Sequence, residues 1–419
     1  MLQNPANSRD APGCIRSTSL IVSGCTGVHP YDLTEILNFD IPSKKTTARS
    51  RRTLARPYKR HFNNIVATNI PSIMKNIRII CLLFLLVLLA PVARAGDKKA
   101  CAAGWDFGLV LKTDGSLWAF GKNERGQLGD GTTTTRTTPV KVMNNVRQMA
   151  AGGSHSLALC NDGSVWSWGS NKSGQLGDGT FQNRYTPKKI MTGMKYVAAA
   201  GGVSMAIGQD GSLWVWGNNK NGKLGDGTTA NNPNPHVLMS GIRDVSCGSS
   251  RILAVGTDGT LWGWGYNRDG YLGDGSRINR LRPVRLASGM RSASQGGDCS
   301  VAVGTDGSLW CWGFGGNGQT GDGTDNDRMR PVRIRTSGVR TAAAGYTTSM
   351  AILTDGTLLG WGSNCDGLLG SNVYNDYVYS PVRVADGIRD VSVSKGYWWA
   401  MWITDSGDLK VVGTMFSKY

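Results

Sequence analysis

The sequence predicts an all-β protein, a seven-bladed β-propeller built from repeats of about 48 residues. A turn followed by a short strand-like segment, as in DGSVWSWG, recurs seven times after residue 95, and the first six copies contain Trp. The turn glycines lie 48, 48, 48, 48, 49 and 51 residues apart, at Gly115, Gly163, Gly211, Gly259, Gly307, Gly356 and Gly407. All fourteen Trp lie in this part of the chain. Repeats of this length are typical of propeller blades, and no helical period recurs in any unit.

Each unit is predicted to form four short strands. In the second unit these are 149–152, 156–160, a strand that carries Trp166 and Trp168, and 187–190. An Asp-Gly pair between the second and third strands supplies residues that accept positive φ, as a tight hairpin requires. Because Trp166 and Trp168 are two residues apart, they share one face of their strand. Such pairs are expected to fill the space between neighbouring blades.

One blade is predicted to be a strand short at the seam of the ring. Seven units supply a first strand, but only six supply a fourth strand that begins with proline. These prolines are Pro139, Pro187, Pro235, Pro283, Pro331 and Pro381. Closing the blades into a ring removes the long exposed edges that a flat sheet of so many strands would have. We therefore expect a propeller over residues 96–419.

A secretory signal peptide is predicted at residues 74–95. Two basic residues precede an apolar run over 79–90, and Ala93 and Ala95 form an Ala-x-Ala cleavage site. The run of 12 residues is shorter than the roughly 20 needed to span a bilayer, so no stable membrane anchor is expected. The protein should be exported, to the periplasm or to the outside of the cell.

Residues 1–73 precede this segment and are interpreted as a mis-assigned or disordered leader, because a signal peptide should begin its chain. The alternative is a basic cytosolic tail that binds phosphates. Residues 1–95 hold 13 Lys and Arg against 4 Asp and Glu, a surplus of nine within the net charge of +17. The remaining +8 is expected to be spread over residues 96–419, so no nucleic-acid partner is predicted.

The repeated unit carries a recognisable signature. The motif N-x-x-G-Q-L-G-D-G-T begins at Asn123 and at Asn171, and variants of it begin at Asn219 and Asn267. The whole unit, AAGGSHSLALCNDGSVWSWGSNKSGQLGDGT followed by Pro, resembles the regulator of chromosome condensation repeat family, a family of seven-bladed propellers. The resemblance covers essentially all of residues 96–419. Because export is predicted, the chain is similar to the secreted bacterial members of this family.

The resemblance implies three roles. A guanine nucleotide exchange factor needs nuclear or cytosolic access and a wedge that projects from one blade, whereas this chain has nearly uniform spacing and a predicted signal peptide. A plant ultraviolet photoreceptor needs a recurrent Gly-Trp-Arg-His-Thr loop, to which residues 104–107 are the nearest approach. A secreted propeller that inhibits β-lactamases through aromatic loops is similar in export and architecture. We therefore expect a noncatalytic scaffold, with an inhibitor of a secreted or periplasmic enzyme as an alternative.

The loops that join the first and second strands differ most among the units, so they are the predicted protein-binding sites. Equivalent loops of a propeller surround the central channel on one face. The candidate partner-binding residues are Trp105, Phe107, His155, Arg251, Tyr346, Tyr397, Trp398 and Trp399. The aromatic members come from units 6, 7 and 1, which are consecutive once the ring closes. Exposed aromatic groups favour protein contacts, with carbohydrate as another option.

Packing at the seam is the alternative for two of these residues. Trp398 and Trp399 could bind a partner or could cover the gap left by the missing strand. Trp402 is expected to be packed, because Ala occupies its position in units 2 to 6.

No catalytic residue, metal site or cofactor is predicted, and the protein is expected to be a monomeric non-enzyme. His155 and His236 are the only histidines after residue 95, too few for a histidine metal cluster, and no triad is recognisable. A recurring Asp in the Gly-Asp-Gly turns is interpreted as a turn former, with calcium binding as an alternative. Its copies are Asp130, Asp178, Asp226, Asp274 and Asp322. A glycosidase-like propeller is the rival class, although its Asp boxes have a spacer that is absent here.

Six cysteines in the predicted exported part permit 15 disulfide pairings. Cys247 and Cys299 lie in adjacent units and form the favoured pair. Otherwise the cysteines are expected to be small buried hydrophobic residues.

Overall fold

The computed structural model describes residues 101–413 except 249, 366, 371–372, 374, 396–398 and 407. The expected leader at 1–73 and signal peptide at 74–95 lie outside the described residues and stay predictions. Within the described residues, no helix has the length and apolar character that crossing a membrane requires.

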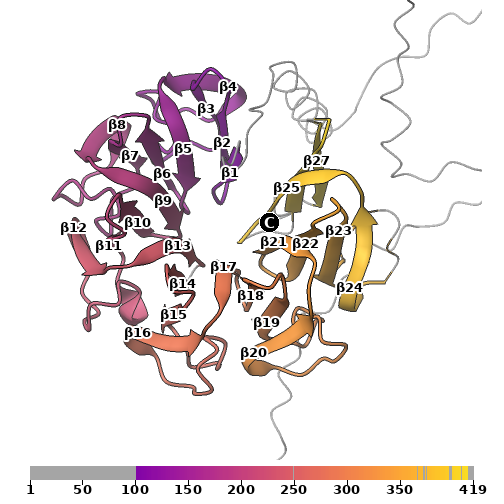
Figure 1. Ribbon diagram of the computed structural model, residues 1–419. Coiled ribbons are helices and arrows are strands. Elements are labelled where there is room, and N and C mark those ends of the chain that lie inside the picture. The colour runs from indigo at the N-terminus through magenta and orange to yellow at the C-terminus, as the bar shows by residue number, and fades with distance from the viewer. Residues whose placement is uncertain are drawn as a thin grey trace, which may run out of the picture. The chain divides into compact units, whose positions relative to one another are not determined.

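Seven antiparallel sheets make up the described part of the chain and form a seven-bladed β-propeller, which confirms the predicted fold class (Figure 1). In each sheet the strands follow one another in chain order from the first strand to the last. The first strands lie around the centre, and the fourth strands lie at the rim (Figure 1). A single turn of 3-10 helix, η2 (Lys220–Gly222), interrupts this pattern in the third blade.

The first two strands of each blade form its inner half. The first strands are β1 (Cys101–Ala103), β5 (Val146–Ala151), β9 (Met194–Ala200), β13 (Ile242–Cys247), β17 (Met290–Gln295), β21 (Val339–Ala344) and β25 (Ile388–Val393). The second strands are β2 (Phe107–Leu111), β6 (His155–Cys160), β10 (Val203–Gly208), β14 (Arg251–Gly256), β18 (Cys299–Gly304), β22 (Thr348–Leu353) and β26 (Trp399–Thr404). In blades 2 to 6 every residue of the second strand is buried.

The last two strands form the outer half. The third strands are β3 (Leu117–Gly121), β7 (Val165–Gly169), β11 (Leu213–Gly217), β15 (Leu261–Gly265), β19 (Leu309–Gly313), β23 (Leu358–Ser363) and β27 (Leu409–Gly413). The fourth strands are β4 (Arg136–Met143), β8 (Arg184–Met191), β12 (Asn232–Met239), β16 (Arg280–Ala287), β20 (Arg328–Arg335) and β24 (Tyr377–Ala385). The seventh blade has three strands among the described residues, in agreement with the predicted short blade.

The strands of the second unit extend beyond their predicted limits. β5 begins at Val146 rather than at residue 149, and β8 begins at Arg184 rather than at residue 187. Arg184 pairs with Gly169 across the sheet. Pairing with the neighbouring strand therefore sets these limits, and no local hydrophobic pattern marks them.

The Asp-Gly turn makes the predicted hairpin between the second and third strands. Gly163 has a φ of 78°, in the left-handed region that glycine adopts without steric cost. Asp162 holds the turn, since its Oδ1 accepts hydrogen bonds from the Ser164 amide at 2.9 Å and from the Ser164 hydroxyl at 2.6 Å. The Trp166 indole donates to the same hydroxyl at 3.0 Å. The turn thus fixes Trp166, which is the outer Trp of the pair.

The inner Trp of each pair joins two blades. Trp168 is fully buried in a cluster with Leu117 and Leu128 of the first blade. Its indole Nε1 donates to the Gln127 carbonyl of that blade at 2.9 Å. The same bond to the preceding blade recurs at Trp216, Trp264, Trp312 and Trp361. The wedge between neighbouring sheets is therefore filled as predicted, and a directional bond is added to the packing.

Replacing Trp168 with Ala should lower the free energy of unfolding by about 3–5 kcal/mol, because it leaves a cavity between two blades. Trp168→Phe should lose less, since the Gln127 carbonyl keeps its bond from the Ser156 hydroxyl at 2.8 Å. Trp166→Ala is the matched control and should cost less than Trp168→Ala, because Trp166 is only partly buried. Chemical denaturation measures all three, and equal losses for both Ala variants would contradict this account.

Candidate functional site

The loops between the first and second strands lie at one end of the channel, and this end is called the loop face. Each first strand begins at the opposite end, which is called the entry face, and runs to the loop face. From Arg147 to Ala151 the strand spans four steps of about 3.3 Å, roughly 13 Å in all. The channel therefore presents two separate surfaces.

Backbone hydrogen bonds connect neighbouring loops of the loop face. The Trp105 amide donates to the Gly153 carbonyl at 3.3 Å, and the Gly153 amide donates to the Gly201 carbonyl at 2.8 Å. On the other side of the ring, the Tyr346 amide donates to the Ser394 carbonyl at 2.9 Å. These loops are thus held by the next blade, so their positions are set before any partner arrives.

Among the described residues of the loop face, Trp105 and Tyr346 are the exposed aromatic ones, with 47% and 38% of their surfaces accessible. The Trp105 indole lies against Gly153, where an added Cβ would be 2.9 Å from the ring. Tyr346 lies in the same way against Gly297, with 2.4 Å between an added Cβ and its ring. Glycine in the neighbouring loop therefore gives each aromatic ring room to lie flat.

Four of the predicted partner-binding residues are buried, which corrects the expectation that their side chains face a partner. Phe107, His155, Arg251 and Trp399 are each the first residue of a second strand. They are 5%, 0%, 2% and 6% exposed. A loop was predicted at these positions because the sequence varies there. In the fold these four positions already belong to buried strands.

The remaining seam residues divide in two. Tyr397 and Trp398 lie outside the described residues, so their role stays a prediction. Trp402 is buried in a cluster with Val391 and Ala400, which confirms that it is packed. Trp399 has an indole nitrogen that is buried without a hydrogen-bond partner.

His155 is a buried hydrogen-bonding residue and is not exposed in a loop. Its Nε2 lies 2.8 Å from the Ser204 hydroxyl of the next blade, and that hydroxyl donates to the Gln175 carbonyl at 2.7 Å. Nε2 must therefore carry the proton, which leaves Nδ1 as a buried acceptor without a partner. Burial lowers the pKa of His155 to about 4, so the ring is neutral at pH 7.

Arg251 connects two blades beneath the loop face. Its Nη2 donates to the Gly297 carbonyl, and it lies 3.8 Å from Asp298 Oδ1. Its guanidinium also lies 5.5 Å from the centre of the Tyr271 ring. Burial lowers the pKa of Arg251 and raises that of Asp298, and the attraction between the two charges opposes both shifts.

A contact across the channel was not foreseen from the sequence. Lys395 follows the first strand of the seventh blade, and its Nζ donates to the Cys247 carbonyl of the fourth blade at 2.8 Å. The Ser246 hydroxyl lies 3.4 Å from the same nitrogen. No motif marks Lys395, because the two segments are 148 residues apart in the chain.

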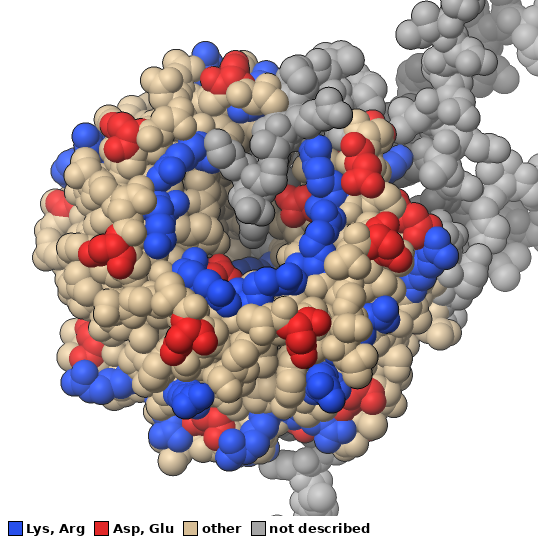
Figure 2. All heavy atoms as spheres, viewed as in Figure 1, with Lys and Arg blue, Asp and Glu red and all other residues tan. Residues whose placement is uncertain are grey.

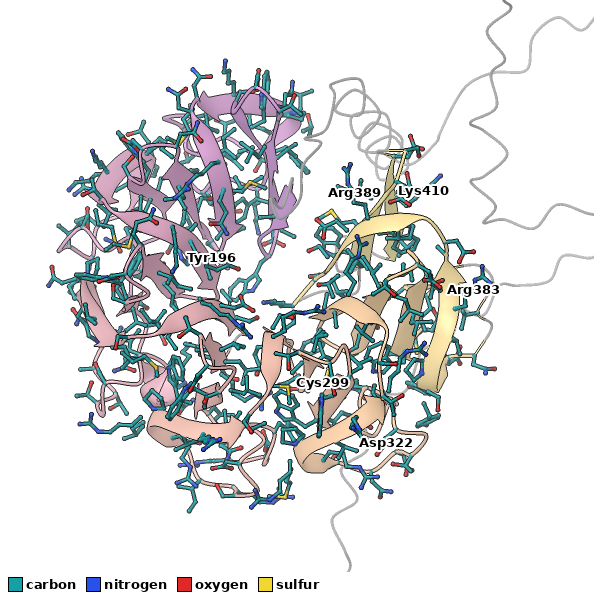
Figure 3. The ribbon with its side chains drawn as sticks, in the orientation of Figure 1. Tyr196, Cys299, Asp322, Arg383, Arg389 and Lys410 are labelled. Carbon is teal, nitrogen blue, oxygen red and sulfur yellow. The ribbon has the colours of Figure 1, made fainter. Side chains whose placement is uncertain are left out.

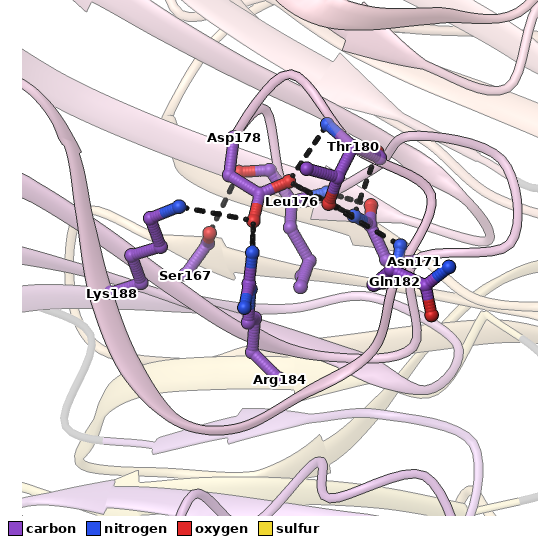
Figure 4. Close-up of polar contacts among 8 residues, drawn as sticks. All are labelled: Ser167, Asn171, Leu176, Asp178, Thr180, Gln182, Arg184 and Lys188. Atoms are coloured by element: carbon purple, nitrogen blue, oxygen red, sulfur yellow. Dashed lines mark hydrogen bonds and ion pairs between the residues drawn. The ribbon is translucent and has the colours of Figure 1, made fainter.

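The recurring Asp is a turn former, as predicted, and it also organises a larger network (Figure 4). Asp178 Oδ1 accepts from the Thr180 amide at 3.1 Å and from Asn171 Nδ2 at 3.1 Å. Its Oδ2 accepts from Arg184 Nε at 2.8 Å, and the Lys188 amine lies 3.4 Å away. Burial alone would raise the pKa of Asp178, but the bonds from Thr180 and Arg184 outweigh it and lower the pKa to about 2.

No group of three or more His, Cys, Asp or Glu residues that could hold a metal ion occurs within the described residues. The favoured disulfide was wrong, because neither Cys247 nor Cys299 forms a disulfide bond and both side chains are buried. Burial raises the pKa of Cys299 to about 11. Cys299 is therefore a neutral thiol at pH 7 and a weak nucleophile.

The positive charge of the propeller is concentrated, which corrects the expectation of an even spread. Figure 2 shows Lys and Arg side chains gathered around the central hollow of one face, while acidic side chains are scattered further out. The sequence concealed this cluster because its members are almost 50 residues apart.

Comparisons with known proteins agree with this architecture. Residues 90–348 match the family described as the RCC1-like domain, and residues 339–368 match the regulator of chromosome condensation (RCC1) repeat. The propeller described above is thus a member of a known class of repeat proteins, and the chain belongs to the RCC1-like domain family. A search of curated proteins finds no significant match.

Solved structures of similar fold include human WBSCR16 and yeast RCC1. WBSCR16 is 22% identical, with a TM-score of 0.63 over 78% of this chain and 94% of that one. Yeast RCC1 (Prp20), in its complex with Kap60, is 22% identical, with a TM-score of 0.62 over 76% of this chain and 80% of that one. Saccharomyces cerevisiae Prp20p, solved in a study of its binding to Gsp1p and histones, is 22% identical, with a TM-score of 0.59 over 76% and 82% of the two chains. At this identity the likeness concerns the fold alone.

Asp178→Asn should lower the free energy of unfolding at pH 7 by about 2 kcal/mol, because it removes a charged acceptor from the bonds of Arg184 and Thr180. The folded pKa lies below the ordinary value of 3.8, so the contribution is present above that value and is lost as the pH falls from 3.8 towards 2. Asp325→Asn is the control, since Asp325 is exposed. Denaturation at pH 7 compares them, and equal losses would count against the network.

His155 should make the fold sensitive to mild acid. The unfolded ring binds a proton near pH 6.5, whereas the folded ring stays neutral to about pH 4, so stability falls as the pH drops through this window. Between pH 7.5 and 4.5 the loss should be roughly 2–3 kcal/mol. It should be largely absent in His155→Leu and retained in His236→Gln. Denaturation at the two pH values measures it, and an unchanged pH dependence in His155→Leu would overturn the assignment.

Proposed function

We propose that this protein is an exported, noncatalytic scaffold that binds another protein through its loop face. The observation that carries the proposal is the pair of exposed aromatic side chains, Trp105 and Tyr346, on loops that differ from unit to unit. The predicted signal peptide at residues 74–95 supports export, to the periplasm or to the outside of the cell.

Rigid presentation supports a binding role for these two residues. Their amides are bonded to the loops of the next blades, and their rings lie against glycines of neighbouring loops. An aromatic side chain that is already fixed loses little conformational freedom when a partner covers it. Large, exposed and ordered aromatic groups are the side chains that contribute most to protein interfaces.

Structural relatives support a protein as the class of partner. Yeast RCC1 (Prp20) was solved bound to Kap60, and a second study of it concerns binding to Gsp1p and histones. In a propeller the framework positions repeat, while the loops are free to specialise. The loop face of this chain can therefore recognise a different protein on the same frame.

The chemistry of the described residues supports a noncatalytic role. His155 is neutral, buried and bonded to Ser204, so it has no access to a substrate. The recurring aspartates are engaged by the Thr or Ser of their own turns. The free cysteines are buried. None of these groups is placed as an accessible nucleophile or general base.

Replacing Trp105 and Tyr346 together with Ala should abolish capture of the natural partner, because the exposed surface of both aromatic side chains would be lost. The test is affinity capture by the purified protein from the periplasmic fraction or culture medium of the producing cell, with mass spectrometry of bound proteins. The melting temperature should change by less than about 2 °C, since surface substitutions have small effects on stability.

Phe181→Ala with Tyr379→Ala is the matched control, because both side chains are exposed but neither belongs to the loop face. This variant should capture the same proteins as the wild type. Equal capture by the Trp105 and Tyr346 variant would refute the site. Turnover of a panel of glycosides would instead establish the glycosidase-like alternative.

A further inference from the structure

The second residue of the first strand is basic in six blades. In each case it follows a buried apolar residue at the entry face, such as Val146 or Ile242. The six residues are Arg147, Lys195, Arg243, Arg291, Arg340 and Arg389, and together they are called the basic ring. Because the first strands surround the centre of the propeller, their equivalent positions surround the channel at one level (Figure 1).

The surface of this face shows the result. Lys and Arg side chains border the central hollow (Figure 2), and Arg389 projects beside β25 (Figure 3). Asp244 and Asp390 are the acidic residues at the next position of the six strands. Even with both counted, the ring keeps a surplus of four positive charges, half of the +8 carried by residues 96–419. Charge is therefore focused at the mouth of the channel.

Hydrogen bonds between blades fix the arginines in place. Arg147 Nη2 donates to the Met194 carbonyl at 2.8 Å, and Arg243 donates to the carbonyl of Met290. Arg291 Nη2 donates to the Val339 carbonyl at 2.9 Å. The same contact recurs from Arg340 to Ile388 at 2.7 Å. The guanidinium groups are thus positioned by the framework, as a preformed site requires.

These contacts leave most of the donors unused. A guanidinium group has five N–H donors, and the bonds to the next blade engage only Nη2. Nε of Arg147 and Nε of Arg243 are buried without any hydrogen-bond partner. Two acidic residues, Asp244 and Asp390, accompany the six basic ones, so they offset only part of the repulsion among the like charges.

We propose that the basic ring binds a compact anion that carries several phosphate groups. Five of the six cations are arginines, whose planar donor forks match the oxygens of phosphate. Cations that converge on one axis suit a ligand whose charges are also clustered. Such an anion would accept hydrogen bonds from the unused donors of the exposed side chains, such as those of Arg291 and Arg340, and would offset the repulsion within the ring.

The arrangement of the basic ring favours a compact anion with several phosphates over two kinds of macromolecule, duplex nucleic acid and an acidic protein segment. Duplex nucleic acid presents phosphates along a line and is bound by stripes of basic residues, whereas six of the seven first strands place their basic residues around the channel. An acidic protein segment would normally add apolar anchors to its charges. The exposed large hydrophobic residues of the described chain lie outside the first strands, at Trp105, Phe181, Tyr185, Val237, Ile278, Tyr346 and Tyr379. The ring therefore offers charge without an apolar anchor.

The site is distinct from the loop face. A first strand of six residues separates the two ends of the channel, so the ligand at the ring and the partner at the loops do not share contacts. Loss of either activity can therefore be measured without loss of the other.

Calorimetric titration of the purified protein with inositol hexakisphosphate at 150 mM NaCl tests the proposal. We expect one-to-one binding that weakens at least tenfold in Arg291→Gln with Arg340→Gln. Because those arginines also join blades, Lys195→Gln serves as a second variant, since the Lys195 side chain makes no hydrogen bond to the described part of the chain. It should weaken binding about threefold while leaving the melting temperature unchanged.

Arg277→Gln with Arg285→Gln is the matched control, because it removes the same charge from exposed positions outside the ring. Its dissociation constant should stay within twofold of the wild type. An equal loss in this control, or no binding to the wild type, would overturn the proposal. So would tighter binding of duplex DNA or of a poly-glutamate peptide at the same salt concentration.

Vesicles distinguish the two sources of such a ligand. Binding to phosphatidylcholine vesicles that contain phosphatidylinositol 4,5-bisphosphate, and not to phosphatidylcholine alone, would identify a lipid headgroup. Binding of the free hexakisphosphate without vesicle binding would identify a soluble anion. Both results support recognition of clustered phosphates, whereas binding to plain phosphatidylcholine vesicles would contradict it.

Discussion

Contact between adjacent blades is the constraint on which the rest of this structure depends. A blade of three or four short strands has too little interior of its own, so its stability comes from the surface that it shares with the next blade. Trp168 illustrates the solution, because it packs among first-blade residues and donates its indole N–H to a first-blade carbonyl. Repetition of this contact fixes the rotation from one blade to the next, and thereby places every loop and every first strand around one channel.

The two ends of the channel follow from that placement but differ in chemistry. At the loop face, variable residues are held by bonds between neighbouring loops, and Trp105 and Tyr346 are exposed. At the entry face, one position of the repeat is basic in nearly every blade, and the repetition itself creates a concentrated charge. Variation among units thus supplies selectivity at one end, and uniformity among units supplies charge density at the other.

Much of the fold was predictable from local chemistry. Asp-Gly turns, Trp pairs two residues apart and proline-led fourth strands gave the seven blades and the short last blade correctly, because hairpins and strand faces depend on nearby residues. The candidate site was less predictable. His155 and Arg251 look like loop residues in the sequence, yet each begins a buried strand, because pairing across the sheet determines where a loop ends. Lys395 carries no local signal at all, since its partner Cys247 lies in another blade.

The sequence by itself determined the repeat, the number of blades, the turns and the residues that fill the wedge between blades. All of these depend on short-range patterns that recur along the chain. Only the tertiary structure decided which variable residues are accessible and which charges are neighbours. Arg147 and Arg340 are almost two hundred residues apart in the chain but occupy the same position of two first strands, β5 and β21. Net charge and composition average over such distances, whereas Coulomb interactions depend on separation in space. The ring of blades converts a weak overall charge into a focused one.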